Sequence, residues 1–180
     1  MNLRIIAGLF KRHKIKSPGN NRTHPMGERI RGAIFNKIVD WLPDAEVLDT
    51  FAGTGALGLE AVSRGAKSAV LVEKDRLAQK IIAENIESLG VEDKVTLVRS
   101  RLQGWLNSRA TNDKFDIIFV DPPYYDPQLN IVKKLTGLLK NGGILILSHS
   151  DSLETPNLPG LVLTDVRKYA GATIAYYLNK

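Results

Sequence analysis

Three glycines spaced as G-x-G-x-x-G, at Gly53, Gly55 and Gly58, constrain the fold of this chain more than any other feature. They follow residues 46–51, a short apolar run typical of a strand, and precede a helical pattern that continues to about Arg64. Glycines in a turn between a strand and a helix let the backbone approach a ligand closely and let the helix pack against the sheet. The spacing therefore predicts a strand–turn–helix unit with a binding site at its turn.

Strands and helices alternate along the rest of the chain. The pattern predicts a helix from about Gly27 to Trp41, strands at 69–72, 95–98, 115–120 and 144–147, helices at 75–89, 102–108 and 126–140, and an antiparallel hairpin of 161–167 with 173–178. Such alternation predicts an α/β fold, a doubly wound, mostly parallel sheet of seven strands with helices on both faces. A ligand crevice is expected beyond the carboxyl ends of the strands at 46–51 and 115–120.

The positive charge is concentrated at the N-terminus. Residues 1–40 carry nine basic and two acidic side chains, a net charge of +7, whereas the remaining residues carry 16 basic and 17 acidic side chains. A solvated tail is one interpretation. Apolar residues such as Ile5 and Leu9 favour instead a folded, basic edge for nucleic acid, built from an exposed hairpin of strands 3–7 and 11–15. We therefore divide the chain into a basic N-terminal extension, 1–25, and a main domain, 26–180.

Several classes of protein are disfavoured by composition. The chain has no cysteine, and His13, His24 and His149 are not spaced like metal ligands. It contains no apolar run of eighteen residues and no signal-peptide pattern. We expect a cytoplasmic protein of 180 residues, monomeric and without a metal.

A second motif, Asp121-Pro122-Pro123-Tyr124, follows the predicted strand 115–120. Proline fixes the backbone, so the Asp121 carboxylate and the Pro122 carbonyl form two acceptors in fixed directions beside the aromatic ring of Tyr124. A planar group that bears an N–H₂ would satisfy all three. The alternative is an ordinary turn at the end of a strand.

Two acidic residues bear on the kind of cofactor. Glu73 ends the strand after the glycine turn, twenty residues beyond Gly53, near the spacing at which a carboxylate meets ribose hydroxyls. Asp49 precedes the turn, where a carboxylate repels a pyrophosphate and attracts a cation. S-adenosylmethionine carries a cationic amino-acid part and no phosphate, so it is favoured over NAD. Asp49 could alternatively brace the turn by accepting hydrogen bonds from backbone amides.

The sequence also resembles a known family. Residues 49–61 and 121–124 are similar to the cofactor and catalytic motifs of class I methyltransferases that act on exocyclic amines, which have a Rossmann-like fold. Residues Arg4-Ile5-Ile6-Ala7-Gly8, with 29–31 and 33–36, resemble the RsmD family, which methylates the exocyclic amine of one guanine in 16S ribosomal RNA. The chain departs from that family at 22–26, at Arg99-Ser100-Arg101, where an acidic residue is common, and at Ser148-His149-Ser150, where a glutamate is common.

The resemblance implies roles for particular residues. Catalysis falls to Asp121, Pro122 and Tyr124. The cofactor is S-adenosylmethionine, and its predicted contacts are Asp49, Phe51, Gly53, Gly55, Glu73 and Asp121. The partner is 16S ribosomal RNA of the small subunit, and its predicted contacts are Arg4, Lys11, Arg12, Lys14, Arg22, Arg29, Arg31, Pro123 and Tyr124.

Other functions stay open at this point. The Asp-Pro-Pro-Tyr motif serves adenine amines of RNA or DNA as well as guanine. A non-catalytic protein that binds S-adenosylmethionine and chaperones ribosomal RNA would need the same pockets. An NAD oxidoreductase is disfavoured by Asp49 and by the lack of an evident hydride-transfer residue.

Overall fold

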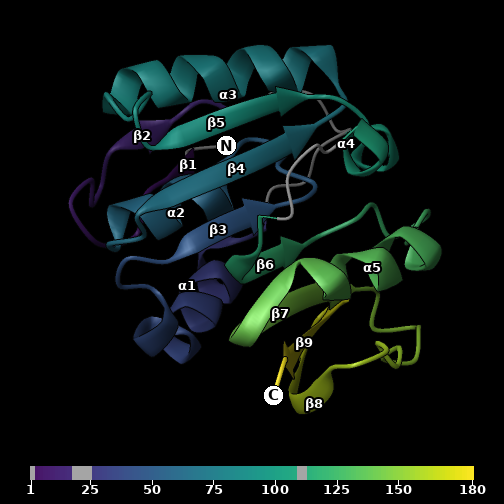
Figure 1. The fold of residues 1–180 in the computed structure, drawn as a ribbon. Helices are drawn as coiled ribbons and strands as arrows, with labels where there is room; N and C mark the ends of the chain where they lie inside the picture. Colours follow the sequence, from purple (N-terminus) through teal and green to yellow (C-terminus); the bar gives the residue numbers. More distant parts are fainter. Residues whose placement is uncertain (1–2, 18–25, 109–112) are drawn as a thin grey trace.

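The computed structural model of the protein describes residues 3–17, 26–108 and 113–180 and centres on a seven-stranded sheet (Figure 1). The strands lie in the order β5-β4-β3-β6-β7-β9-β8. The first five are parallel, and β9 is antiparallel to both of its neighbours. The bounds are β3 Glu46–Asp49, β4 Ser68–Glu73, β5 Val95–Arg99, β6 Phe115–Val120, β7 Leu139–His149, β8 Val162–Tyr169 and β9 Ala172–Leu178. The predicted sheet is confirmed.

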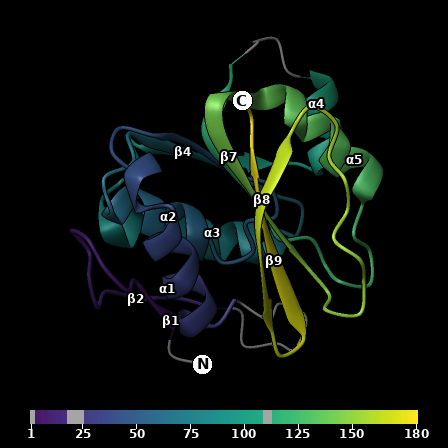
Figure 2. The ribbon, with the colours of Figure 1, turned by 90° about the horizontal axis from the view of Figure 1, so that it is seen from below.

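Helices cover both faces of this sheet, as a doubly wound fold requires (Figure 2). One apolar cluster joins α1, α2 and α3 to one face, and a second joins α4 and α5 to the other. Successive strand residues alternate between the clusters: Val47 belongs to the first and Leu48 to the second. The bounds are α1 Glu28–Lys37, α2 Ala56–Ser63, α3 Arg76–Leu89, α4 Leu102–Ser108 and α5 Leu129–Leu135, with 3₁₀ turns η1 Val39–Trp41 and η2 Thr136–Leu138.

Helix α3 begins and ends where its sequence signals place it. The Asp75 carboxylate accepts a hydrogen bond from the Ala78 amide at 2.9 Å, which satisfies one free N–H of the first turn. At the other end Gly90 adopts φ +62°, a left-handed cap that residues with a side chain rarely take.

The N-terminal hairpin is shorter and more buried than predicted. Its paired strands are β1 Leu3–Arg4 and β2 Lys14–Ile15. Leu3, Ile5 and Ile15 are buried in the same apolar cluster as α1, α2 and α3, so the expectation of an exposed hairpin is wrong. Exposed cations occupy only part of the hairpin, and the intervening side chains pack inward. The division of the chain at residue 25 stays a prediction.

Backbone hydrogen bonds fix the hairpin to α2. The carboxylate of Glu60, which is fully buried, accepts from the Ile6 and Ala7 amides at 2.7 and 3.0 Å. The Leu9 amide donates to the Ser63 carbonyl at 2.7 Å. Between them Gly8 has φ +84°, and a Cβ there would lie 1.8 Å from the Ser63 oxygen. The hairpin can therefore dock this closely only because residue 8 is glycine.

The boundary between α5 and β7 differs from the prediction. The helix predicted at 126–140 covers only Leu129–Leu135, and β7 begins at Leu139 rather than Ile144. Leu139 pairs with Phe115, and the register shifts before Ile144 pairs with Ile117. Gly142 and Gly143, which separate the predicted helix 126–140 from the predicted strand 144–147, lie inside β7 and exchange backbone hydrogen bonds with Asn179 at 2.6 and 3.1 Å.

No helix among the described residues is long and apolar enough to cross a membrane. Over the same ranges, His, Asp and Glu side chains form no cluster suited to a metal ion.

Candidate active site

A cavity of about 1120 Å³ opens at the carboxyl ends of the parallel strands. Its wall includes the glycine turn after β3, Glu73 at the end of β4 and all four residues of the Asp-Pro-Pro-Tyr motif after β6. Because β3 and β6 are paired neighbours, the two motifs meet in one cavity although about 70 residues separate them. The predicted location of the crevice is confirmed.

The cavity has two halves that follow the strand order. Ser100, Arg101 and Gln103, which follow β5, lie on the wall with the glycine turn and Glu73. On the other side the wall contains Ser148 of β7 and residues 170–172 at the β8–β9 turn. We call these the β3–β5 half and the β6–β9 half.

The glycine turn is held close to the sheet. Gly53 and Gly55 have φ +56° and +79°, and a Cβ on Gly58 would lie 2.6 Å from Leu71 of β4. Glycine at these positions lets the turn curl over the strand ends and lets α2 pack directly on the sheet. Phe51 and Gly53, two predicted cofactor contacts, lie on the cavity wall, whereas Gly55 is buried.

Glu73 fastens the turn to the end of β4. Its carboxylate accepts from the Gly53 amide at 2.8 Å and from the Lys74 and Asp75 amides at 2.7 and 2.8 Å. A carboxylate has about four acceptor positions, so about one is left for a donor in the cavity. Its predicted contact with ribose hydroxyls stays a prediction that this geometry permits.

Asp49 lies behind the turn rather than on the cavity wall. The side chain is buried, and Oδ2 accepts from the Gly58 amide at 3.2 Å. Oδ1 is buried and has no close hydrogen-bond partner among the described residues, although the nearby Phe51 amide also lowers the pKa of Asp49. Burial raises the pKa of Asp49 to about 7. The turn-bracing role is thus present in the structure, and the free oxygen is a position at which a cationic or N–H donor would be stabilised.

The Asp-Pro-Pro-Tyr motif presents its polar groups to the cavity. Burial raises the pKa of Asp121 to about 6, an effect that a hydrogen bond from Ser148 opposes. The Tyr124 hydroxyl lies 2.8 Å from the Ser148 hydroxyl. Tyr124 is 39% exposed, and Tyr125, also on the wall, is 89% exposed. One carboxylate and an aromatic face thus lie side by side in the β6–β9 half.

Ser148 was not predicted as a site residue. It is 2% exposed and lies at the carboxyl end of β7, the strand next to β6. The available signal was its position at the end of a central strand, where the sequence departs from the family pattern. The adjacent His149 is buried, and its ring nitrogens contact the Ser150 carbonyl and the Thr155 hydroxyl at 2.8 and 3.1 Å.

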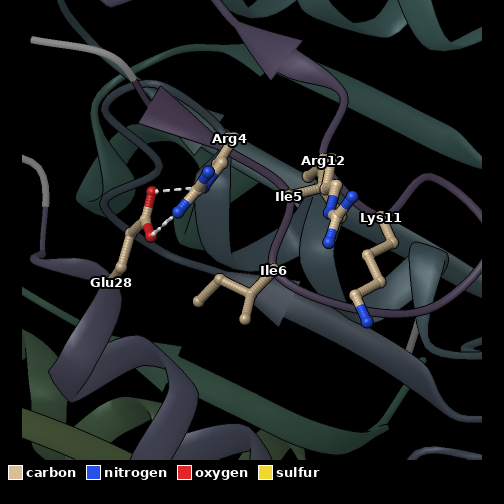
Figure 3. A pocket seen from close by; sticks show the side chains of 6 residues that line it. All are labelled: Arg4, Ile5, Ile6, Lys11, Arg12 and Glu28. Atoms are coloured by element: carbon tan, nitrogen blue, oxygen red, sulfur yellow. Dashed lines mark hydrogen bonds and ion pairs between the residues drawn. The ribbon is translucent and has the colours of Figure 1, made fainter.

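A smaller hollow of about 390 Å³ lies on the N-terminal hairpin and the start of α1 (Figure 3). Arg4, Lys11 and Arg12 line it with Ile5 and Ile6. Arg4 forms an ion pair with Glu28 at 3.1 Å, and both side chains are partly exposed. The hollow thus brings together three of the predicted RNA contacts and one carboxylate.

The other predicted RNA contacts are dispersed. Lys14 and Arg29 are exposed, and Arg22 lies outside the described residues, as does His24. Lys16, a further cation of the hairpin, forms an ion pair with Glu84 at 2.8 Å.

Arg31, a predicted RNA contact, is buried rather than exposed to solvent. Its side chain is 1% exposed, and its guanidinium donates to the Arg4 and Met26 carbonyls at 2.5 and 3.3 Å. Its Nε lies 3.8 Å from the buried Glu60 carboxylate. The docked hairpin covers this side of α1, and Arg31 also lies on the wall of the larger cavity. Burial lowers the pKa of Arg31, and the nearby Glu60 opposes this effect.

Comparison with known proteins places the chain in a family. The family described as "Conserved hypothetical protein 95" matches residues 3–178. The protein named "Putative rRNA methyltransferase YlbH" of Bacillus subtilis is 29% identical over 99% of this chain and 100% of its own length. "Ribosomal RNA small subunit methyltransferase D" of Escherichia coli strain K12 is 34% identical over 79% of this chain and 69% of its own.

Solved structures agree with this assignment. The structure titled "Putative methyltransferase yhhF from Escherichia coli" superposes with a TM-score of 0.86 at 28% identity, over 100% of this chain and 99% of that one. The family match spans almost the whole sequence and includes both motifs of the cavity. The chain therefore belongs to the RsmD family, the family that its motifs resemble.

Proposed function

We propose that this chain transfers a methyl group from S-adenosylmethionine to the exocyclic amine of a guanine in the RNA of the small ribosomal subunit. The observation that carries the proposal is that the glycine turn and the Asp-Pro-Pro-Tyr motif open into the same cavity, in a member of the RsmD family. Relatives named for methylation of small-subunit ribosomal RNA support the choice of substrate. The reaction would take place in the cytoplasm.

The β3–β5 half fits S-adenosylmethionine. Glu73 keeps about one acceptor position for a ribose hydroxyl, and the unpartnered Oδ1 of Asp49 suits the amino-acid end, directly or through a water molecule. The bound cofactor supplies a methyl group already activated by its sulfonium. The protein therefore needs no strong nucleophile of its own, only a means to position and activate the amine.

The β6–β9 half would hold the target base. In this mechanism the Asp121 carboxylate and the Pro122 carbonyl accept the two N–H bonds of the amine, which favours a pyramidal nitrogen and stabilises its growing positive charge. Tyr124 stacks on the base and keeps the amine in line with the methyl group. A paired base cannot reach this depth, so the nucleotide must be unpaired or flipped out. Asp121, with a pKa of about 6, is ionised at neutral pH and can accept the released proton.

The N-terminal hairpin would bind the RNA backbone. Arg4, Lys11 and Arg12 line one hollow. Lys14 in β2 and Arg29 in α1 are also exposed. Cations that contact phosphates release counterions, so RNA binding is expected to weaken steeply as salt increases. A flat salt response would argue against this part of the proposal.

The choice of guanine over adenine has a direct test. Purified protein is incubated with tritiated S-adenosylmethionine and deproteinised or partly assembled small-subunit RNA, and the nucleosides are then identified by mass spectrometry. The proposal predicts N2-methylguanosine at one position. N6-methyladenosine would shift the assignment to an adenine amine. Binding of RNA and cofactor with no transferred label would favour the RNA chaperone.

A further inference from the structure

The ends of β6 and β7 bring Asp121 and Ser148 side by side. Val120 pairs with Leu147 in the parallel register, so the next residue on each strand lies at the same edge of the sheet. Ser148 is almost fully buried and lines the β6–β9 half of the cavity. Its hydroxyl lies 2.8 Å from the Tyr124 hydroxyl, and from its position beside Asp121 it lowers the pKa of that carboxyl through a hydrogen bond.

The chemistry of the three groups sets the direction of these hydrogen bonds. An ionised carboxylate can only accept, so the Ser148 hydroxyl donates its one proton to Asp121. The oxygen of Ser148 must then accept from Tyr124, whose hydroxyl has the remaining proton. The result is a directed chain from Tyr124 through Ser148 to Asp121.

We propose that Ser148 is a positioning residue for methyl transfer: it anchors the Tyr124 ring and the Asp121 carboxylate to each other, so that the stacking face and the amine acceptor stay in one geometry. This inference rests on the proposed function, because it assigns Ser148 a role in that reaction. Ser148 itself does not touch the reacting atoms in this account.

Ser148 also keeps Asp121 ionised. Burial raises the pKa of Asp121, and the hydrogen bond from the Ser148 hydroxyl lowers it. The ionisable neighbours that interact with Asp121 are Asp49 at the end of β3 and Tyr124, with Asp151 beyond the tyrosine. None of them is a cation, so among these groups only Ser148 favours the charged form that accepts the amine.

The first test measures Asp121 in the unliganded protein by carbon-detected NMR titration of its carboxyl group. Ser148→Ala is expected to raise the pKa of Asp121 by about one unit, since a hydrogen bond to a charged group is lost. Ser150→Ala is the matched control, because the Ser150 hydroxyl contacts Ser152 and not the motif. An unchanged Asp121 titration in Ser148→Ala would overturn the proposal.

The second test measures methyl transfer to RNA as a function of pH. Ser148→Ala should lower kcat about tenfold at pH 7 and should shift the acid limb of the pH–rate profile to higher pH, together with the Asp121 pKa. KM for RNA should stay within about threefold of the wild-type value, because the stacking ring remains. Tyr124→Phe removes only the hydroxyl of the ring and should lower kcat to a similar extent.

Because both residues act through one chain, the double variant should be no slower than the slower single variant. Multiplicative losses with an unchanged pH profile would mean that the two residues act independently and would refute the proposal. If the Asp121 pKa moves as expected but the wild-type protein transfers no methyl group, the hydrogen-bond chain stands and the proposed reaction fails.

Discussion

Burial of the single carboxyl of Asp49, a predicted cofactor contact, lowers the stability of the folded protein as pH rises. Burial raises its pKa to about 7, so the folded protein holds a proton on this carboxyl at pH values where the unfolded chain has released it. The contribution to stability is therefore full below the unfolded pKa of 3.8 and is lost as pH rises to about 7. Burial also raises the pKa of Asp121, to about 6, so its contribution to stability is likewise lost as pH rises.

This linkage predicts the behaviour of Asp49→Asn. The variant lacks the titrating carboxyl. The decrease in its free energy of unfolding between pH 5 and pH 8 should therefore be smaller than the decrease in the wild type, and the difference should be roughly 1–3 kcal/mol. Denaturant unfolding at the two pH values measures the difference. Asp93→Asn, at an exposed position in the loop before β5, serves as the control. Parallel pH dependence in the wild type and Asp49→Asn would contradict the burial argument.

Glu28 is expected to compete with RNA for the basic hollow. Its carboxylate pairs with Arg4 at the hollow that Lys11 and Arg12 also line. The pair is exposed on both sides, so it contributes little to stability. Glu28→Gln should therefore raise RNA affinity about two- to fivefold at low salt, measured by fluorescence anisotropy. Glu92→Gln, at an exposed position before β5, should have no such effect. Equal or weaker binding by Glu28→Gln would remove the hollow from the RNA interface.

Arg31 and Ser148 mark the limit of prediction from sequence at this scale. Motif spacing placed Gly53, Glu73 and the residues of the Asp-Pro-Pro-Tyr motif correctly on one cavity, because short-range patterns determine where strands end. Whether Arg31 is covered depends on the docking of a hairpin from another part of the chain. The contacts of Ser148 depend on the register between β6 and β7, which no local pattern encodes.

Among the elements, the N-terminal hairpin makes the tightest approach to the main domain. Gly8→Ala would add a Cβ 1.8 Å from the Ser63 carbonyl at a positive φ, so the hairpin must shift or detach. We expect the free energy of unfolding to fall by roughly 2–4 kcal/mol and trypsin cleavage at Lys11 and Arg12 to accelerate. At Gly27 an added Cβ would meet nothing within 4 Å. Gly27→Ala should therefore change the free energy of unfolding by no more than about 0.5 kcal/mol and the rate of trypsin cleavage by no more than about twofold. Equal behaviour of the two variants would contradict the docking described above.

The elements that sequence predicted well and poorly differ in a physical respect. Helix α3 has its own start and stop signals at Asp75 and Gly90, and its bounds matched the prediction closely. The end of α5 and the start of β7 have no such signals. The Asn179 amide donates to the Leu139 and Lys140 carbonyls at 2.9 and 3.1 Å, and so stabilises the strand where glycines suggested a break. That contact comes from the far end of the chain, so local propensity could not anticipate it.

At the scale of the whole molecule, charge and chemistry are arranged for one task. The positive excess lies in the first forty residues, and the cavity at the carboxyl edge of the sheet has Glu73 and Asp121 on its wall, with Asp49 buried behind the glycine turn. In the proposed reaction the basic hairpin holds RNA, while the carboxylates of the cavity receive a cationic methyl donor and an extruded base. The central claim is that Asp121 acts on the amine and is not required to retain the cofactor.

Asp121→Ala tests this claim most directly. S-adenosylhomocysteine affinity is measured by calorimetry and tritium transfer to small-subunit RNA by scintillation, with Asp93→Ala as the control variant. The account predicts that transfer falls by about a thousandfold while the affinity for S-adenosylhomocysteine stays within about threefold of the wild type. Transfer within tenfold of the wild type would contradict it.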